Sequence, residues 1–440
     1  MIRRTSKFFA HIMERWLPDA FVIAIIITFI VLITGVLTQD YSPTYMVRLW
    51  GDGVWDLLVF SMQVTITLFT GSVLAQTEAV RGGLKKIASI AKTPEQAIVL
   101  MTMIALICCW ISWGFGLIAS ALMARQIALQ VKGVHYPLLV ASAYSGMLVW
   151  HAGLSASIPL KIAATDGDEL SALLEGNTIP LSETIFSWES LTICLILFVT
   201  LPLVNRLMLP PPAETIEVEP HKININTNPD IKISTPANYV ENHRLPTFLL
   251  GLLGVYYLVD YITYDGVIGL NTINFIFLVA GLLLHQSPAS YLAALSEAVK
   301  GLCGVVLQFP LYAGIMGMMV GSGLAASMSG WFVSISNADN FTLLTFLSAG
   351  LVNIFVPSGG GQWAIQAPIV IPAAQSLGVP LHQAAMAVAF GDAWTNMIQP
   401  LWALPLLGIA RLKIRDIMGY CTVTLIWSGF VFALGMIFLF

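Results

Sequence analysis

The chain has 440 residues, of which 57% are hydrophobic and only 10% are charged, and its mean hydropathy is +0.82. An ordinary soluble domain carries about 25% charged residues, so this composition excludes a soluble globular protein and places the chain in a lipid bilayer. The formal net charge of -4 decides little, because the positions of Lys and Arg matter more than their sum in a membrane protein.

Two apolar runs open the chain, and basic residues mark their cytoplasmic ends. The first run covers 20–38 and the second about 54–75, each long enough to span a hydrocarbon core of about 30 Å. The positive-inside rule places the flanking Lys and Arg residues in the cytoplasm, so the intervening stretch 41–53 is expected to be an external loop. The basic residues are Arg3, Arg4, Lys7 and Arg15 before the first run, and Arg81, Lys85, Lys86 and Lys92 after the second.

The next two apolar runs are interrupted. The run 96–131 is broken by Ser-Trp-Gly-Phe-Gly at 112–116, which predicts a re-entrant hairpin that enters and leaves from the cytoplasm. The run 137–160 crosses outward through a second break at 144–153, and a further span, 186–207, returns the chain to the cytoplasm. The external loop between these spans has no Lys or Arg and contains Asp166, Asp168, Glu169, Glu175 and Glu183.

A change of composition then divides the chain into two halves. From residue 210 onward Pro, Asn, Thr and charged residues replace the apolar ones without any hydrophobic period, which predicts an extended or irregular cytoplasmic linker. We therefore expect a first inverted repeat over 1–209, the linker over 210–245, and a connecting span with the second repeat over 246–440. The connecting span, about 246–260, starts the second half in the opposite orientation.

The second half repeats the breaks of the first. Pro-Ser-Gly-Gly-Gly at 357–361 and the stretch 390–400 each lie 246 residues after a first-half break, as the pair Ser112 and Ser358 illustrates. This pattern predicts an all-α polytopic membrane protein with two inverted-topology repeats, re-entrant hairpins and broken helices. We expect about nine spans in addition to the two hairpins.

The charge pattern reverses between the halves. The counterpart of the basic loop after the second run, 327–340, carries only one charged residue, Asp339, and is expected outside. The counterpart of the acidic loop, 411–416, reads Arg-Leu-Lys-Ile-Arg-Asp and is expected in the cytoplasm. Interrupted helices at corresponding positions of two inverted repeats indicate a transporter whose binding site lies between the repeats.

The broken segments supply neutral polar groups. A half-helix N-terminus carries roughly +0.5 of a charge, so it can receive a carboxylate without a buried Lys or Arg. Close helix packing in lipid also favours Ser and Gly, and this alternative stays open for each single residue. The tryptophans at or beside the breaks either line a pocket for a short aliphatic tail or pack in the core: Trp113, Trp150, Trp363, Trp394 and Trp402. The predicted substrate-binding residues are Ser112, Gly114, Trp150, Ser155, Ser358, Gly359, Gly360, Gly361, Gln362, Thr395 and Asn396.

Two ionisable residues in the broken spans are candidates for ion coupling. A carboxylate inside a span costs roughly 2.5 to 3.5 kcal/mol on insertion scales, so Asp392, expected in an unwound stretch, either carries an ion or caps the break. His151 occupies the matching first-half break and titrates near neutrality, although a packed core histidine is the alternative. A coupling proton would use Asp392 or His151. Sodium would use the oxygens around Ser358, Thr395 and Asn396.

With these motifs placed, the chain resembles the bacterial short-chain fatty acid transporters that serve acetoacetate and butyrate uptake. The resemblance covers the whole length and rests on Arg-Trp-Leu-Pro-Asp at 15–19, Pro-Ser-Gly-Gly-Gly-Gln-Trp at 357–363 and Gly-Asp-Ala-Trp-Thr-Asn at 391–396. It implies membership of the ion-transporter superfamily: a homodimer with a scaffold domain, an elevator motion of the hairpin domain, and a place in the bacterial inner membrane. Relatives with sodium-binding Ser-Asn-Thr signatures differ from this chain, which has Ser-Trp-Gly and Ser-Gly-Gly at the tips.

The sequence thus predicts a secondary carrier that imports short-chain monocarboxylates by proton symport. The alternative is a sodium-coupled carrier of another small anion such as a dicarboxylate, and a passive channel is a further rival that lacks counterflow. No His-Glu-x-x-His, Gly-x-Ser-x-Gly or paired intramembrane Asp is present, and the five cysteines lack metal-ligand spacing. We therefore expect no enzyme activity, no cofactor and no metal; the expected partners are the substrate and membrane lipid, with no nucleic acid.

Overall fold

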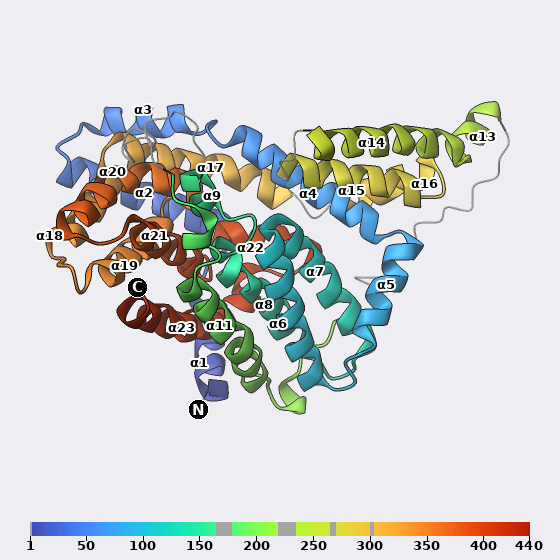
Figure 1. Cartoon of the computed structure of the whole chain (residues 1–440). Coiled ribbons are helices and arrows are strands. Elements are labelled where there is room, and N and C mark those ends of the chain that lie inside the picture. Colours follow the sequence, from blue (N-terminus) through green and yellow to red (C-terminus); the bar gives the residue numbers. More distant parts are fainter. Residues whose placement is uncertain (1, 164–177, 219–234, 265–269, 300–302) are drawn as a thin grey trace.

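Helices make up the folded part of this chain. The computed structural model describes residues 2–163, 178–218, 235–264, 270–299 and 303–440 (Figure 1), and no β-strand is present within these ranges. The all-α prediction is confirmed. Four residues of the expected acidic loop lie outside the described part, namely Asp166, Asp168, Glu169 and Glu175.

The first half is a series of apolar helices with short connections. One sequence expectation is wrong here, because the stretch 41–53 contains a helix instead of a loop. The Ser42 hydroxyl accepts the N–H of Tyr45, and Pro43 takes the first helical position, where no N–H donor is needed. The elements are α1 (Ile2–Trp16), α2 (Ala20–Thr38), α3 (Pro43–Gly53), α4 (Leu58–Ala75), α5 (Glu78–Ala88), α6 (Pro94–Ile111), α7 (Trp113–Gln130), α8 (Tyr136–Tyr144), η1 (Ser145–Ala152), α9 (Ser157–Ala163), η2 (Leu181–Glu183) and α11 (Trp188–Leu207).

The second half follows a short linker, of which residues 219–234 lie outside the described part. Its first long helix is the expected connecting span, four residues longer at its C-terminal end than predicted. The elements are η3 (Pro212–Glu214), α13 (Pro236–Asn242), α14 (Leu245–Tyr264), α15 (Leu270–Leu284), α16 (Pro288–Val299), α17 (Cys303–Gly321), α18 (Leu324–Ser334), α19 (Phe341–Asn353), α20 (Gly359–Leu377), α21 (Leu381–Thr395), α22 (Pro400–Ala410) and α23 (Ile414–Phe438).

Corresponding helices of the two halves begin at a nearly constant offset. α5 and α18 begin at residues 78 and 324, α6 and α19 at 94 and 341, and α7 and α20 at 113 and 359, which gives offsets of 246, 247 and 246 residues. Two unrelated apolar halves would not keep this register over several helix starts. The repeat predicted from the four breaks is therefore present in the order and spacing of the helices.

Two helical hairpins turn at the predicted breaks. α6 and α7 pack against each other and are joined through Ser112 alone, and Figure 1 shows them side by side. α19 and α20 also pack against each other and are joined by residues 354–358. The two broken spans follow: α8 passes through the 3₁₀ segment η1 before α9, and α21 is separated from α22 by residues 396–399.

Burial distinguishes central from peripheral spans. Six described helices are long and apolar enough to cross a membrane, or seven if the bent pair α17 and α18 forms one span, so the expected nine must include shorter helices. In the 18-residue apolar window of the broken span Tyr136–Ala163, 89% of the residues are buried, whereas only 17% are in that of α14. Interrupted backbone thus lies where protein surrounds it. α14 projects with α15 and α16 away from the hairpins in Figure 1 and presents an apolar surface suited to lipid.

The start of the linker is tied to the rest of the protein. We name residues 210–218 the strap. The Ile216 N–H donates to His135 Nδ1 at 3.0 Å, the Tyr136 N–H donates to the Ile216 carbonyl at 2.8 Å, and Glu214 pairs with Lys7 at 2.6 Å. The strap is irregular apart from the 3₁₀ turn η3, but the prediction of an irregular linker is wrong at α13, which is a short helix. The sequence gave no sign that the strap docks between α1 and the start of α8.

His135 makes the strap sensitive to acid. Burial lowers the pKa of His135 to about 4, so the ring stays neutral, accepts from Ile216 at Nδ1 and donates from Nε2 to the Tyr420 hydroxyl at 2.8 Å. An unfolded histidine titrates near 6.5, so this stabilisation is complete above about pH 6.5 and is lost as the pH falls toward about 4.

We expect the melting temperature of His135→Asn, which keeps an acceptor but cannot titrate, to fall less steeply than that of wild type between pH 6.5 and 4. The measurement is a series of thermal melts of the purified protein. His11→Asn, at an exposed position of α1, is the control and should keep the wild-type slope. Equal slopes for wild type and His135→Asn would contradict the assignment.

Candidate functional site

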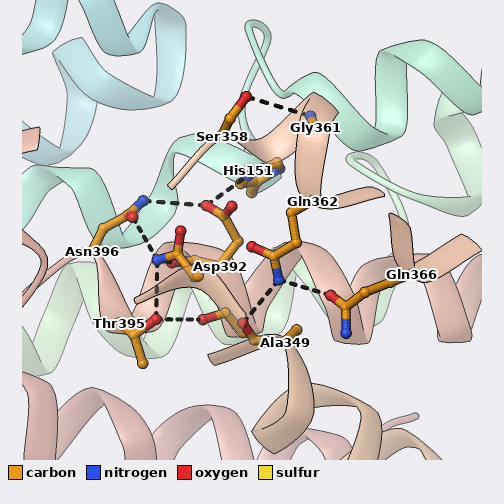
Figure 2. Close-up of polar contacts among 11 residues, drawn as sticks. His151, Ala349, Ser358, Gly361, Gln362, Gln366, Asp392, Thr395 and Asn396 are labelled. Carbon is orange, nitrogen blue, oxygen red and sulfur yellow. Dashed lines mark hydrogen bonds and ion pairs between the residues drawn. The ribbon is translucent and has the colours of Figure 1, made fainter. Parts of the chain in front are cut away.

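The two candidate coupling residues, predicted separately from two halves of the chain, lie next to each other. His151 comes from η1 and Asp392 from α21, and Figure 2 shows their side chains facing each other. His151 Nε2 lies 3.4 Å from Asp392 Oδ1, and neither side chain is exposed. Within the described part of the chain, His151 Nδ1 and Asp392 Oδ2 have no hydrogen-bond partner. Buried polar atoms ordinarily have hydrogen-bond partners, so the unpartnered atoms of this pair indicate a functional site.

Asp392 itself is helical, which corrects the expectation of an unwound stretch. α21 continues to Thr395, because the Asn396 N–H still donates to the Asp392 carbonyl at 3.2 Å. The break begins only at Asn396, whose side-chain Nδ2 donates to Asp392 Oδ1 at 3.2 Å. The Asp392 carboxylate, one turn before the end of α21, is therefore hydrogen-bonded to Asn396, the first residue of the break.

Asn353, at the end of α19, organises this break and was missed by the sequence analysis. Its Nδ2 donates to the Asp392 carbonyl at 2.9 Å, to Thr395 Oγ1 at 3.0 Å and to Asn396 Oδ1 at 2.8 Å. The repeat gave no sign of it, because the residue 246 positions earlier is Ile107. The sequence did offer one signal of its role, since Asn353 is an amide inside an apolar run and close to a predicted break.

The α20 tip approaches the His151–Asp392 pair. Ser358 is the N-cap and its hydroxyl accepts the Gly361 N–H at 3.4 Å, so Gly359, Gly360 and Gly361 form a helical first turn, where the sequence suggested loosened backbone. A Cβ on Gly359 would lie 2.6 Å from His151 Nε2, whereas one on Gly360 would meet nothing within 4 Å. Gly359 is thus needed for the close approach, which brings the positive end of the α20 dipole to the pair.

Gln362 fixes the second hairpin internally. Its Nε2 donates to the Ala349 carbonyl and to Gln366 Oε1, both at 2.8 Å (Figure 2). Gln366 in turn donates to the hydroxyls of Ser329 and Ser348, at 3.2 and 3.3 Å. The bond to the Ala349 carbonyl therefore holds α20 to α19, and the Gln362 Oε1, which lacks a hydrogen-bond partner in the described residues, remains for another role.

The α7 tip forms the other side of the candidate site. Ser112 has an extended backbone and makes no side-chain cap, and Ser155 Oγ instead accepts the Trp113 N–H at 2.9 Å. Gly114 is the second residue of α7. Ser112, Gly114 and Ser155 thus gather at this tip, and the Trp150 ring contacts both Trp113 of the tip and His151.

Three of the five break tryptophans form one cluster. The Trp113 ring centroid lies 6.2 Å from that of Trp150 and 5.1 Å from that of Trp402, and Trp150 and Trp402 are 6.2 Å apart. The Trp150 ring also packs on His151, with a centroid separation of 3.6 Å. Trp394 instead stacks on Phe346 in the core.

Buried hydrogen bonds join the two halves around this site. The Tyr144 hydroxyl donates to the Asn396 carbonyl at 2.5 Å, and the Tyr136 hydroxyl donates to the Ala410 carbonyl at 2.9 Å. Neither tyrosine was a candidate from the sequence, in which Tyr136 precedes the predicted span and Tyr144 is the first residue of its predicted break. The first-half break is therefore attached directly to the second-half break.

A family model and two relatives match nearly the whole chain. A family model described as "Short chain fatty acid transporter" matches residues 1–439. Proteins of Escherichia coli (strain K12) and Haemophilus influenzae, both provisionally named short-chain fatty acid transporters, are each 42% identical to it. The first alignment covers 99% of both chains and the second 100% of both. The crystal structure of the Alcanivorax borkumensis YdaH transporter aligns over 96% of this chain and 97% of that one, with 14% identity and a TM-score of 0.44.

Proposed function

Because this chain belongs to the short-chain fatty acid transporter family, we propose that it imports monocarboxylates such as acetoacetate and butyrate by proton symport. Membership makes it a multi-pass membrane transporter and not an enzyme. The bacterial inner membrane as its location is part of the proposal.

The observation that carries the proposal is the buried His151–Asp392 pair at the α20 tip. A proton that binds the neutral-histidine pair cancels the negative charge of the Asp392 carboxylate, so the pair has no net charge and no longer repels the substrate anion. The substrate carboxylate would lie at the N-terminus of α20, among Ser358, Gly359 and Gly360, where helix amides and the dipole favour an anion. Proton and carboxylate together carry no net charge, which lowers the electrostatic cost of crossing the bilayer.

The proposal also covers the movement of the protein during transport and its oligomeric state. We propose a homodimer in which the hairpin region moves against a scaffold that includes α14 and α15. The support is the separation of these regions in Figure 1 and the large apolar surface of α14. A dimer contact would bury part of that surface.

Sodium coupling with another small anion, such as a dicarboxylate, is the second candidate. It is favoured by three buried side-chain oxygens that lack a hydrogen-bond partner among the described residues, namely Asn353 Oδ1, Gln362 Oε1 and Asp392 Oδ2. Oxygen atoms around broken helices are the ligands that transporters offer to sodium.

Uptake into proteoliposomes with an imposed ion gradient distinguishes proton coupling from sodium coupling. We expect an inward pH gradient to raise the initial rate of labelled acetoacetate uptake, and an inward sodium gradient at equal pH to leave it unchanged. Because protonated acids also cross lipid unaided, the rate in protein-free vesicles is subtracted. Counterflow of labelled substrate without any ion gradient separates a carrier from a channel. Stimulation by sodium alone would overturn proton symport.

A further inference from the structure

An open pocket of about 490 Å³ lies where the start of α1 meets the end of α11. The described residues that line it are Arg3 and Arg4, with Ile2 beside them and Leu207 from the last turn of α11. Both arginines are exposed, and neither guanidinium group makes an ion pair or hydrogen bond with a described residue. Because a guanidinium group binds phosphate through two parallel hydrogen bonds, this pair is suited to a phosphate group.

An apolar stripe of α11 leads from the interior of the membrane to this pocket. Leu195, Val199, Leu203 and Leu207 recur at every fourth residue, so they share one face of the helix, and each is more than half exposed. At 1.5 Å per residue the stripe is about 18 Å long, slightly more than the roughly 15 Å that one leaflet contributes to a hydrocarbon core of about 30 Å. A lipid acyl chain therefore has the length to lie along the stripe while its headgroup reaches the arginines.

The surface of α1 is typical of a helix that lies in the membrane interface. Phe8 and Trp16 are 61% and 74% exposed, whereas Ser6 is buried. The main chain of Ala10 packs so closely on α23 that a Cβ on Gly419 would lie 2.4 Å from it. Exposed apolar side chains next to basic ones characterise interfacial amphipathic helices, and Trp favours the depth of the headgroups. The start of α1 is thus held at the level of the headgroups, on the side expected to be cytoplasmic.

We propose that Arg3 and Arg4 bind the phosphate of an anionic phospholipid whose acyl chain lies along the α11 stripe. A zwitterionic headgroup carries a positive charge of its own, which the two guanidinium groups repel, so the site selects lipids with a net negative charge. This inference does not depend on the transported solute or on the coupling ion, because it requires only that the protein spans a membrane.

The test measures lipid binding by native mass spectrometry of the whole protein in a neutral detergent. Wild type is expected to bind phosphatidylglycerol more tightly than phosphatidylcholine. The test variant combines Arg3→Gln with Arg4→Gln. Because one basic residue near an anionic membrane surface contributes roughly fivefold in affinity, we expect its dissociation constant for phosphatidylglycerol to rise about 25-fold, with phosphatidylcholine binding unchanged. Arg15→Gln, the same change at an exposed position of α1 outside the pocket, is the control and should bind as wild type.

A second variant approaches the same pocket from α11. Leu207→Glu places a carboxylate beside the two arginines at an exposed position, so folding is preserved, and a comparable loss of phosphatidylglycerol binding is expected. Melting temperatures without added lipid verify that each variant is folded. Equal affinity of wild type for the two lipids, unchanged binding in either test variant, or an equal loss in Arg15→Gln would overturn the lipid site. Displacement of phosphatidylglycerol by inorganic phosphate at equal concentration would also overturn it, in favour of a site for free phosphate.

Discussion

Asp392→Asn is expected to abolish uptake driven by a pH gradient while preserving counterflow. Asparagine has nearly the shape of a protonated carboxyl group and can still accept the hydrogen bond from Asn396, but it can neither bind nor release a proton. Exchange of substrate needs no proton release, so it continues. A gradient of one pH unit is worth about 1.4 kcal/mol per proton, so its loss should lower the protein-dependent accumulation of labelled substrate at steady state about tenfold.

The control for this experiment is Asp339→Asn, the same change at an exposed loop position. It should behave as wild type in both assays. Folding is not expected to suffer in Asp392→Asn, because the neutral amide is less costly to bury than a fully enclosed carboxylate. Retention of pH-driven uptake by Asp392→Asn would remove Asp392 from the coupling mechanism.

Gly359→Ala is expected to reduce uptake strongly although it adds a single methyl group. That methyl would lie 2.6 Å from His151 Nε2 and 3.1 Å from the Trp150 ring, so the α20 tip or the imidazole must move. The separation of His151 from Asp392 would change with it. Since misplacement of a reacting group by about 1 Å can lower a rate about 100-fold, we expect a loss of at least tenfold.

The neighbouring glycine provides a matched control for this prediction. Gly360→Ala adds the same methyl group in the same helical turn, but nothing lies within 4 Å of it. Both changes raise helix propensity by about 0.5–1 kcal/mol, so a difference between them isolates the contact with His151. Uptake rates and melting temperatures of the two variants are compared. Similar uptake by both would show that the close approach of Gly359 to His151 does not affect transport.

The sequence predicted the turns of this fold well because their causes are local. Ser and Gly interrupt apolar runs at both tips, with Pro357 added at the second. Ser112 and Ser358 adopt nearly the same extended backbone before their helices, with φ/ψ of −158/120° and −150/105°. The constant spacing of the breaks reappears as the constant spacing of helix starts. Breaks of this kind need no information about distant parts of the chain.

Contacts between distant segments were harder to predict from the sequence. Asp392 was expected in unwound backbone, but helix propensity and the bond to the Asn396 N–H extend α21 past it. Asn353 and Tyr144 act on residues 39 to 252 positions away, and no period or spacing in the sequence reveals such pairs. The proximity of His151 to Asp392 could be suspected from the matching breaks, whereas the distance between them could not.

The two tyrosines that join the broken spans have a consequence for the transport cycle. Tyr136 and Tyr144 lie at opposite ends of α8, and each donates to a main-chain carbonyl of the other half. Relative sliding of these two spans would break both bonds inside a buried region. We therefore expect the two broken spans to keep their mutual position during transport, so a solute would meet the same side chains from either side of the membrane.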